Sequence, residues 1–182
     1  MRLFVSVDID DLAPEVAEVQ APFRELSGLN LTDPEQAHIT MKFLGEADHD
    51  LDTLTAAIET AVEGADVEPF DAEFEGLGVF PSLDYISVIW LGVEAGSESL
   101  TELHEQLELE TTGLGYEEEQ HEFTPHVTLA RMDHAGSKDE VQRLVQEEHP
   151  EVGTLNIGEV RLTESTLTQA GTEYETVERF EL

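Results

Sequence analysis

The chain has 182 residues, of which 42 are acidic and only 8 basic, so its formal net charge is −34; 40 % of the residues are hydrophobic and none is cysteine. This length suits one domain, or two small lobes that share an interface, and the lack of cysteine excludes disulfides, thiolate metal sites and a cysteine nucleophile. No apolar run approaches the roughly 18 residues of a membrane span, and the first residues alternate, unlike a signal peptide.

The acidic residues are spread along the whole chain, while a hydrophobic pattern persists throughout. An acidic interaction protein or a partly disordered chain would share the charge, but the surviving core pattern favours adaptation to a very salty cytoplasm. At molar salt the Debye length is about 3 Å, so the negative charges are screened from one another. We therefore expect a cytoplasmic protein of a halophilic archaeon, with no membrane partner, in which any polyanion site is a local basic island.

Periodicity and turn signals predict the elements of the first half of the chain. Alternating apolar residues indicate the first strand. An acidic cap followed by a proline in the first turn marks the start of the next helix, and Pro22 is expected to bend that helix. The expected elements are a strand at 2–8, a helix at 10–28, a turn around Asp33-Pro34-Glu35, a strand at 38–45 and a helix at about 50–63.

The second half of the chain repeats this order. We expect strands at 70–80 and 85–93 that form a hairpin, a helix at 97–114, a strand at 124–131, a helix at 137–148, and strands at 154–163 and 174–182 joined by a turn that includes Gln169-Ala170-Gly171. The sequence strand, helix, strand, helix thus occurs twice. It predicts an α+β fold of mainly antiparallel sheet with outer helices, built as two related lobes in a single domain over 1–182.

One tripeptide pattern occurs in both halves, as His38-Ile39-Thr40 and His126-Val127-Thr128, each inside an apolar run. Residues i and i+2 of a strand share a face, so each histidine would stand beside its threonine. One such pair is usually structural, but two in matching repeats favour a functional site. The remaining histidines have no matching copy and are expected to be structural or solvent-facing: His49, His104, His121, His134 and His149.

The pattern fits phosphodiester chemistry better than the alternatives. There is no His-Glu-x-x-His, a zinc site on His38 and His126 lacks a third ligand, and no Gly-x-Ser-x-Gly is present. We therefore expect neither a metal nor another cofactor. One neutral imidazole can take a proton while a protonated one gives a proton, because a histidine pKa near 6.5 makes both forms accessible. Threonine hydroxyls can hold the non-bridging oxygens, whose charge grows in the transition state.

Neighbouring residues extend the candidate site. Lys42 has the strand parity of His38, so it is either a substrate contact or a cation at a strand end. Arg131 has the opposite parity to His126 and reaches the site only if its strand ends or bulges. Among the nearby aromatic residues, Phe80 is the better candidate to stack a base, whereas Phe43 and Phe123 are expected in the core.

These motifs resemble the two-histidine (2H) phosphoesterase superfamily, named for its paired His-x-Thr/Ser motifs, and within it the RNA 2′,3′-cyclic phosphodiesterase branch, historically called 2′-5′ RNA ligase. The resemblance runs nearly end to end. It covers the opening strand at 2–8, His38-Ile39-Thr40-Met41-Lys42-Phe43-Leu44-Gly45-Glu46, the segments 78–81 and 88–93, Phe123-Thr124-Pro125-His126-Val127-Thr128-Leu129-Ala130-Arg131, and the last strands.

The resemblance implies two pseudo-twofold-related lobes with the active-site cleft between them. It implies metal-independent hydrolysis of RNA 2′,3′-cyclic phosphate ends to 2′-phosphate, with His38 as the acid, His126 as the base, and Thr40, Thr128 and Arg131 binding the phosphate. The alternatives are 2′-5′ RNA ligation as the main role, and a non-catalytic module that binds nucleotide ends. The acidic surface favours a short RNA end or a small cyclic nucleotide as substrate, and we expect a monomer.

Overall fold

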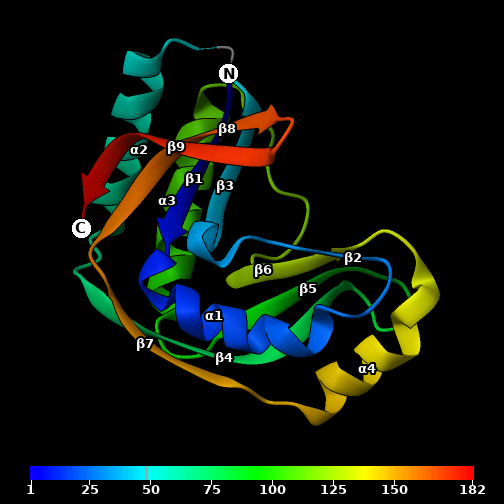
Figure 1. Cartoon of the computed structure of the whole chain (residues 1–182). Helices are drawn as coiled ribbons and strands as arrows, with labels where there is room; N and C mark the ends of the chain where they lie inside the picture. The colour runs from blue at the N-terminus through cyan, green and yellow to red at the C-terminus, as the bar shows by residue number, and fades with distance from the viewer. Residues whose placement is uncertain (48) are drawn as a thin grey trace.

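The computed structural model describes residues 1–47 and 49–182, which form one curled antiparallel sheet of nine strands with helices packed against it (Figure 1). The strands are β1 (Arg2–Asp8), β2 (Leu29–Leu31), β3 (His38–Glu46), β4 (Phe70–Pro81), β5 (Ile86–Val93), β6 (His126–Met132), β7 (Glu151–Ile157), β8 (Glu159–Thr168) and β9 (Gly171–Glu181). The helices are α1 (Ala13–Gln20), α2 (Leu51–Ala65), α3 (Ser97–Gly113) and α4 (Lys138–Glu147), with short 3-10 turns at Asp10–Leu12, Ala21–Phe23, Pro34–Gln36 and Ala135–Ser137.

The sheet consists of two four-stranded halves that meet between the two motif strands. Its strand order is β7-β4-β5-β6-β3-β1-β8-β9, and the short β2 pairs with β6 outside this path. β3 and β6 are joined through one residue pair, Ile39 with Val127. The predicted repeat is present, because β1, α1, β3 and α2 in the first half correspond to β5, α3, β6 and α4 in the second. This arrangement confirms the expected α+β fold of two related lobes.

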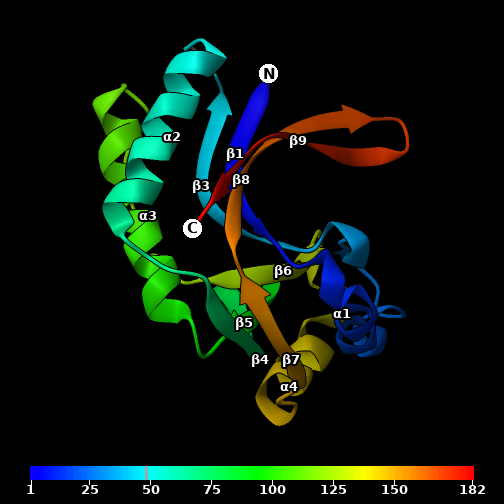
Figure 2. The same cartoon turned by 90° about the vertical axis from the view of Figure 1, so that its left-hand side faces the viewer.

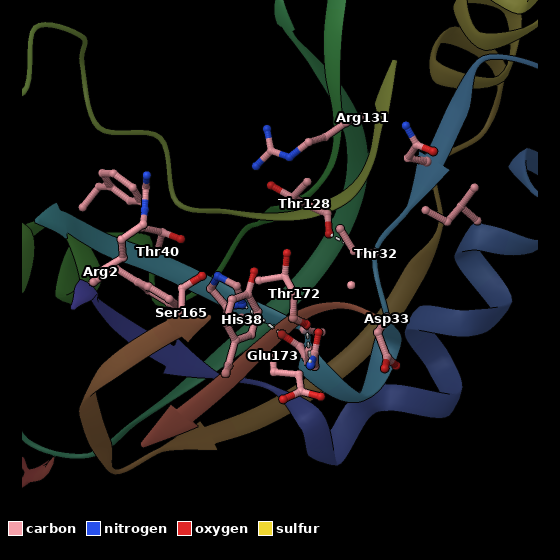
Figure 3. Close-up of a pocket in the computed structure, with 18 of the residues that line it drawn as sticks. Arg2, Thr32, Asp33, His38, Thr40, Thr128, Arg131, Ser165, Thr172 and Glu173 are labelled. Carbon is pink, nitrogen blue, oxygen red and sulfur yellow. Dashed lines mark hydrogen bonds between the residues drawn. The ribbon is translucent and has the colours of Figure 1, made fainter. Parts of the chain in front are cut away.

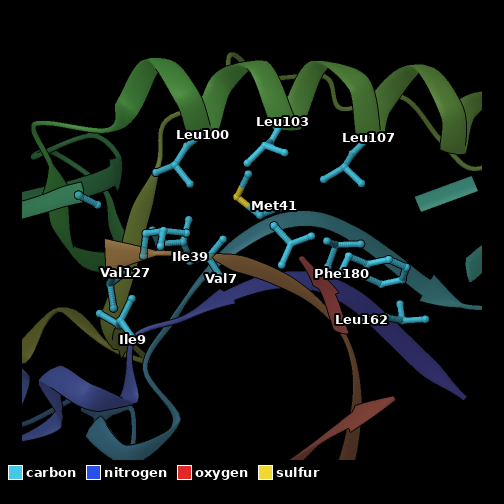
Figure 4. Close-up of a cluster of buried hydrophobic side chains, with 14 of the residues drawn as sticks. Val7, Ile9, Ile39, Met41, Leu100, Leu103, Leu107, Val127, Leu162 and Phe180 are labelled. Carbon is cyan, nitrogen blue, oxygen red and sulfur yellow. The ribbon is translucent and has the colours of Figure 1, made fainter. Parts of the chain in front are cut away.

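The main core lies between helices α2 and α3 and the β1–β3 part of the sheet (Figure 2). Leu100, Leu103 and Leu107 recur at helical spacing along α3 and point onto Met41 and Ile39 of β3 (Figure 4). All five side chains are at most 1 % exposed, and burying each contributes about 1.5–3 kcal/mol. The face of β3 turned toward α3 is therefore apolar at Ile39 and Met41, and the alternating His38 and Thr40 lie on its other face.

A second, smaller core supports the other half of the sheet. Ile86 and Ile89 of β5 and Ala130 of β6 pack against Val141 and Leu144 of α4, with Phe23 closing the cluster. The motif strand β6 contributes to both cores, since Val127 and Leu129 belong to the main one and Ala130 to the smaller one. None of the helices that the structure describes is long and apolar enough to cross a membrane.

Two sequence-based predictions of elements were wrong. The helix expected at 10–28 ends at Gln20 and continues as a 3-10 turn at Ala21–Phe23, because Pro22 lacks an N–H and its ring disfavours a continued α-helix; residues 29–31 then form β2. The strand expected at 154–163 is two strands separated by Gly158. Before this glycine the chain forms β7, which pairs with β4, and after it the chain forms β8, which pairs with β1. The chain therefore crosses from one half of the sheet to the other at Gly158.

Candidate active site

The pairing of β3 with β6 brings both His-x-Thr motifs onto one face of the sheet. Ile39 and Val127, the middle residues of the motifs, pair with each other and are fully buried (0 % exposed). In an antiparallel pair with this register, His38 lies across from Thr128 and Thr40 lies across from His126. The four polar side chains therefore share the face opposite the core.

Both motif strands carry a β-bulge directly after the threonine. Val5 of β1 faces two residues of β3, Met41 and Lys42, because the register shifts between Thr40 and Lys42. In β6 the register shifts likewise, so that Trp90 pairs with Thr128 but Ile89 pairs with Ala130. Burial follows the same order over six residues in both strands. A bulge reverses the facing of the residues that follow it.

The bulge in β6 turns Arg131 toward the site. Its side chain lines the same cleft as His38, Thr40 and Thr128. Burial lowers the pKa of His38 and of His126, and the positive charge of Arg131 acts in the same direction. Burial raises the pKa of Tyr174, and the charge of Arg131 opposes that shift. The condition set by strand parity, that Arg131 reaches the site only where the strand bulges or ends, is therefore met.

The bulge in β3 turns Lys42 away from the cleft, contrary to the expectation from strand parity. Lys42 is 4 % exposed, and its Nζ donates to Glu108 Oε1 of α3 at 2.7 Å and to the carbonyl oxygen of Glu117 at 2.6 Å. It lies on the α3 side of the strand, not in the cleft, because simple alternation does not apply across the extra residue. Lys42 is therefore not a substrate contact.

Backbone carbonyls orient both imidazoles in the same way. The Nδ1 of His38 lies 2.9 Å from the carbonyl oxygen of Gln36, and the Nδ1 of His126 lies 2.6 Å from that of Thr124. A carbonyl oxygen only accepts, so each Nδ1 carries the hydrogen. This leaves each Nε2 free to accept a proton when the ring is neutral and to donate one when it is charged.

Aromatic rings flank both histidines. Phe4 and Tyr174 lie 5.0 and 5.3 Å from the His38 ring, and Phe80 and Trp90 lie 4.9 and 5.9 Å from the His126 ring. Burial lowers the pKa of both histidines, against the opposing effect of their carbonyl hydrogen bonds. The expected stacking residue Phe80 thus packs edge to face against His126; whether it also contacts a base remains a prediction.

The negative charge of Asp8 makes the surroundings of His38 different from those of His126. Asp8 pairs with His38 across β1 and β3 and acts to raise its pKa. The carboxylate is held by Arg161 Nη1 at 2.7 Å and by the Ser6 hydroxyl at 2.8 Å. The corresponding partner of His126 in β5 is Gly92, which carries no charge. His38 therefore has a nearby carboxylate that favours its protonated form, and His126 has none in this position.

The cleft in front of these residues has a volume of about 670 Å³ (Figure 3). Its walls include three residues that the motif analysis missed, Arg2, Tyr174 and Thr172. The β8–β9 hairpin brings Tyr174 and Thr172 to His38 from far along the chain, and no local pattern marks them. Arg2 was detectable, since it alternates with the buried Leu3 and Val5 of β1. His126 lies beside the cleft, half-buried against Phe80 and Trp90, whose rings also contact each other.

Other residues singled out from the sequence lie elsewhere. None of the five remaining histidines lines the cleft in the described part of the chain. His104 is buried and stacks on Phe123 at 4.1 Å, which confirms Phe123 as a packing residue. Phe43, expected in the core, is 57 % exposed and lines the cleft, so that expectation was wrong. Among residues 1–47 and 49–182, no group of three His, Asp or Glu side chains is placed to hold a metal ion.

The curled two-lobed sheet with paired His-x-Thr strands defines a 2H phosphoesterase. The family model of the 2′-5′ RNA ligase superfamily matches residues 9–168, and the chain belongs to this family. Proteins named RNA 2′,3′-cyclic phosphodiesterase are similar along the whole chain. One from Methanothermobacter thermautotrophicus is 33 % identical, covering 100 % of this chain and 99 % of the relative. One from Archaeoglobus fulgidus is 33 % identical and covers 100 % of both chains.

Solved structures agree with this placement. The crystal structure of a Thermus thermophilus protein superimposes with a TM-score of 0.82 at 27 % identity, over 100 % of this chain and 98 % of that one. The Escherichia coli LigT structure complexed with 3′-AMP has a TM-score of 0.78 at 22 % identity, over 100 % and 97 % of the two chains. The second likeness supports the fold alone.

Proposed function

We propose that this protein is an RNA 2′,3′-cyclic phosphodiesterase, which hydrolyses the cyclic phosphate at an RNA end to a 2′-phosphate. The names of its archaeal relatives support this activity. The observation that carries the proposal is the Ile39–Val127 pairing, which sets two oriented imidazoles and two threonine hydroxyls on one face of the sheet. Two imidazoles at one site supply the base and the acid that cleavage of a phosphodiester requires.

The reaction requires one histidine to take up a proton from water and the other to donate a proton to the leaving oxygen. His126 Nε2 takes a proton from a water molecule, whose oxygen forms the new bond to phosphorus. The bond from phosphorus to the 3′ oxygen breaks, and His38 Nε2 donates its proton to that oxygen. Asp8 favours the charged form of His38. Burial lowers the pKa of His126, and the positive charges of His38 and Arg131 act in the same direction. This asymmetry supports His38 as the acid and His126 as the base.

Three further residues stabilise the phosphate. The hydroxyls of Thr40 and Thr128 and the guanidinium of Arg131 line the cleft on the face of the two histidines. Negative charge on the non-bridging oxygens grows as water attacks, and donors held in place stabilise it without reorganisation. Arg131 can bind two oxygens at once through parallel N–H groups in one plane, a geometry that a lysine lacks.

Ligation is the second candidate, supported by the family's description as 2′-5′ RNA ligases. The same residues would act on an RNA 5′-hydroxyl in place of water. The ratio of hydrolysed to joined product, measured with a cyclic-phosphate end and a 5′-hydroxyl end at equal concentrations, discriminates between the two roles.

The test uses purified protein in high salt and a 2′,3′-cyclic mononucleotide. Chromatography that separates 2′- from 3′-phosphate products should find the 2′-phosphate. His38→Ala and His126→Ala should each abolish hydrolysis, because each removes one proton transfer, whereas the exposed His121→Ala serves as a matched control and should retain it. Full activity of either motif variant would overturn the mechanism, and a non-catalytic binding module would yield no product at all.

A further inference from the structure

The far part of the β8–β9 hairpin projects from the body of the protein and forms one wall of the cleft (Figure 2). Nearly all of residues 166–175 are exposed. Alternate residues of β9 face inward, since Thr172 and Tyr174 line the cleft, while Tyr174 and Thr176 line an adjoining cavity of about 190 Å³. His38 also lines both spaces. Tyr174 therefore stands with His38 at the boundary between the cleft and this smaller cavity.

Two aromatic contacts hold the Tyr174 ring in place. The ring lies 5.3 Å from the His38 ring at an interplanar angle of 89°, and 5.3 Å from the Phe4 ring at 76°. Edge-to-face contact at this separation is a preferred geometry of aromatic pairs. Tyr174 thus has a defined position beside the histidine that acts as the acid.

The backbone near Tyr174 is anchored to the residue that orients His38. The side-chain amide of Gln36 donates to the carbonyl oxygen of Thr172 at 3.2 Å. The carbonyl oxygen of the same Gln36 lies 2.9 Å from His38 Nδ1 and accepts its hydrogen. Gln36 therefore fixes the hairpin and the imidazole together, and the Tyr174 ring keeps its place relative to the reacting group.

The hydroxyl of Tyr174 is available to a substrate. Tyr174 is 38 % exposed, and within residues 1–47 and 49–182 its hydroxyl makes no hydrogen bond to the protein. Burial raises the pKa of the phenol, and the positive charge of Arg131 opposes that shift. Arg131 lines the cleft and not the smaller cavity. The phenol is therefore on the cleft side, close enough to the guanidinium to be affected by its charge.

The direction of the pKa shift determines which role the phenol can take. The pKa is raised from a value near 10, so the phenol keeps its proton in the pH range where the histidines exchange theirs. A protonated phenol donates a hydrogen bond to an anionic oxygen. It does not take a proton from water, and the base remains His126.

We propose that Tyr174 is a further catalytic residue, whose hydroxyl donates a hydrogen bond to a non-bridging oxygen of the cyclic phosphate, beside Arg131. The inference rests on the proposed function. A donor that is already held in place stabilises the charge that grows on this oxygen without reorganisation. Thr40 and Thr128 supply their hydroxyls from the motif strands, and Tyr174 adds a third hydroxyl from the projecting hairpin.

Two substitutions separate the hydroxyl from the ring. Tyr174→Phe removes the oxygen alone and should lower kcat by roughly 10²-fold, the scale of one lost oxyanion donor, with a smaller change in KM. Both limbs of its pH profile should stay in place, because the phenol does not titrate there. Tyr174→Ala also removes the ring. It should move the alkaline limb to higher pH, because the burial that lowers the pKa of His38 is reduced.

The measurements use a 2′,3′-cyclic mononucleotide in high salt, with Tyr85→Phe as the matched control. Tyr85 is 70 % exposed and outside the cleft lining, so this variant should keep the kcat of the wild type. The thermal unfolding midpoint of Tyr174→Phe, followed by circular dichroism, should equal that of the wild type, because the lost hydroxyl has no partner in the protein.

Three results would overturn the inference: an unchanged kcat in Tyr174→Phe, a loss that appears in KM alone, or a lowered unfolding midpoint that accounts for the loss of activity. Each would leave Tyr174 as a residue that only packs against His38. A wild type that does not hydrolyse the cyclic mononucleotide would instead overturn the proposed function, so the two failures are distinguishable.

Discussion

At the scale of single residues, the two histidines differ in what surrounds them more than in how they are oriented. Both hold Nδ1–H against a carbonyl two residues earlier, and burial lowers the pKa of both. Only His38 has the carboxylate of Asp8 opposite it. A symmetric pair of motifs thus acquires unequal acid–base properties from one neighbouring side chain.

The first prediction concerns pH. Activity requires neutral His126 and protonated His38, so kcat/KM should be bell-shaped. A lowered pKa of His126 makes the base available at lower pH, and a lowered pKa of His38 removes the acid at lower pH. Both limbs should therefore lie below the positions set by an ordinary histidine, near pH 6.5.

Asp8→Asn extends the same measurement. Removing the carboxylate that raises the pKa of His38 should move the alkaline limb to still lower pH, with a smaller change in the acid limb. A shift of the alkaline limb to higher pH, or of the acid limb alone, would contradict the assignment of His38 as the acid.

Loss of a threonine hydroxyl should reduce kcat more than it changes KM, because its contact strengthens in the transition state. We expect Thr40→Ala and Thr128→Ala each to lower kcat by roughly 10²–10³-fold, as measured by steady-state kinetics. Thr40→Ser and Thr128→Ser keep the hydroxyl and should recover much of the rate. If serine fails to restore activity in either position, the hydroxyl is not what the site uses.

At the scale of elements, the two bulges decide which residues face the substrate, and each bulge is held by side chains from another element. The carbonyl oxygen of Met41 in β3 accepts from His104 Nδ1 of α3 at 2.7 Å. The carbonyl oxygen of Leu129 in β6 accepts from Gln20 Nε2 at 3.0 Å and from the Thr32 backbone N–H at 3.0 Å. Helices that cover the sheet thus also fix the local geometry of the motif strands.

Gln20→Ala tests this support. Gln20 is 1 % exposed and its amide also donates to the carbonyl oxygen of Thr32 at 2.8 Å. Its loss removes the donor to that part-buried oxygen and one of the donors to Leu129, and should reduce stability by about 1–3 kcal/mol. It should also lower kcat, because the bulge aims Arg131. In an Arg131→Ala background the effect of Gln20→Ala on kcat should be smaller. Additive effects in this double-mutant cycle would show that Gln20 does not act through Arg131.

At the scale of the whole molecule, chain topology holds the two halves of the sheet together, whereas the negative charge opposes the compact fold. β7 and β8 follow each other in the chain with only Gly158 between them. β7 lies in the second half of the sheet and β8 in the first. This return is a second connection between the two halves of the sheet, besides the pairing of β3 with β6. The negative charge acts against such compactness, since like charges repel in the folded state.

Salt should therefore stabilise the protein. The midpoint of thermal unfolding, followed by circular dichroism, should rise markedly between dilute buffer and molar salt, because screening shortens the reach of repulsion to about 3 Å. Potassium chloride and sodium chloride should act alike if screening is the cause. A midpoint that does not depend on salt would exclude self-repulsion as a major term.

The sequence by itself determined the two His-x-Thr pairs, most of the helices and strands, and the two-lobed order of the fold. These features depend on local periodicity, which a linear pattern records. It also stated the condition for Arg131 correctly, as a bulge or a strand end. It was wrong about Phe43, and it offered Lys42 as a possible substrate contact because it assumed unbroken alternation along β3.

Only the tertiary structure decided which residues enter the cleft. A bulge exists in relation to a partner strand, so the shifts at Met41 and Leu129 depend on the register with β1 and β5. Tyr174 reaches His38 only through the β8–β9 hairpin. Pairing between distant segments is set by the packing of the whole sheet, and that is why the sequence identified the reacting residues while the structure selected the neighbours that orient, charge and extend their site.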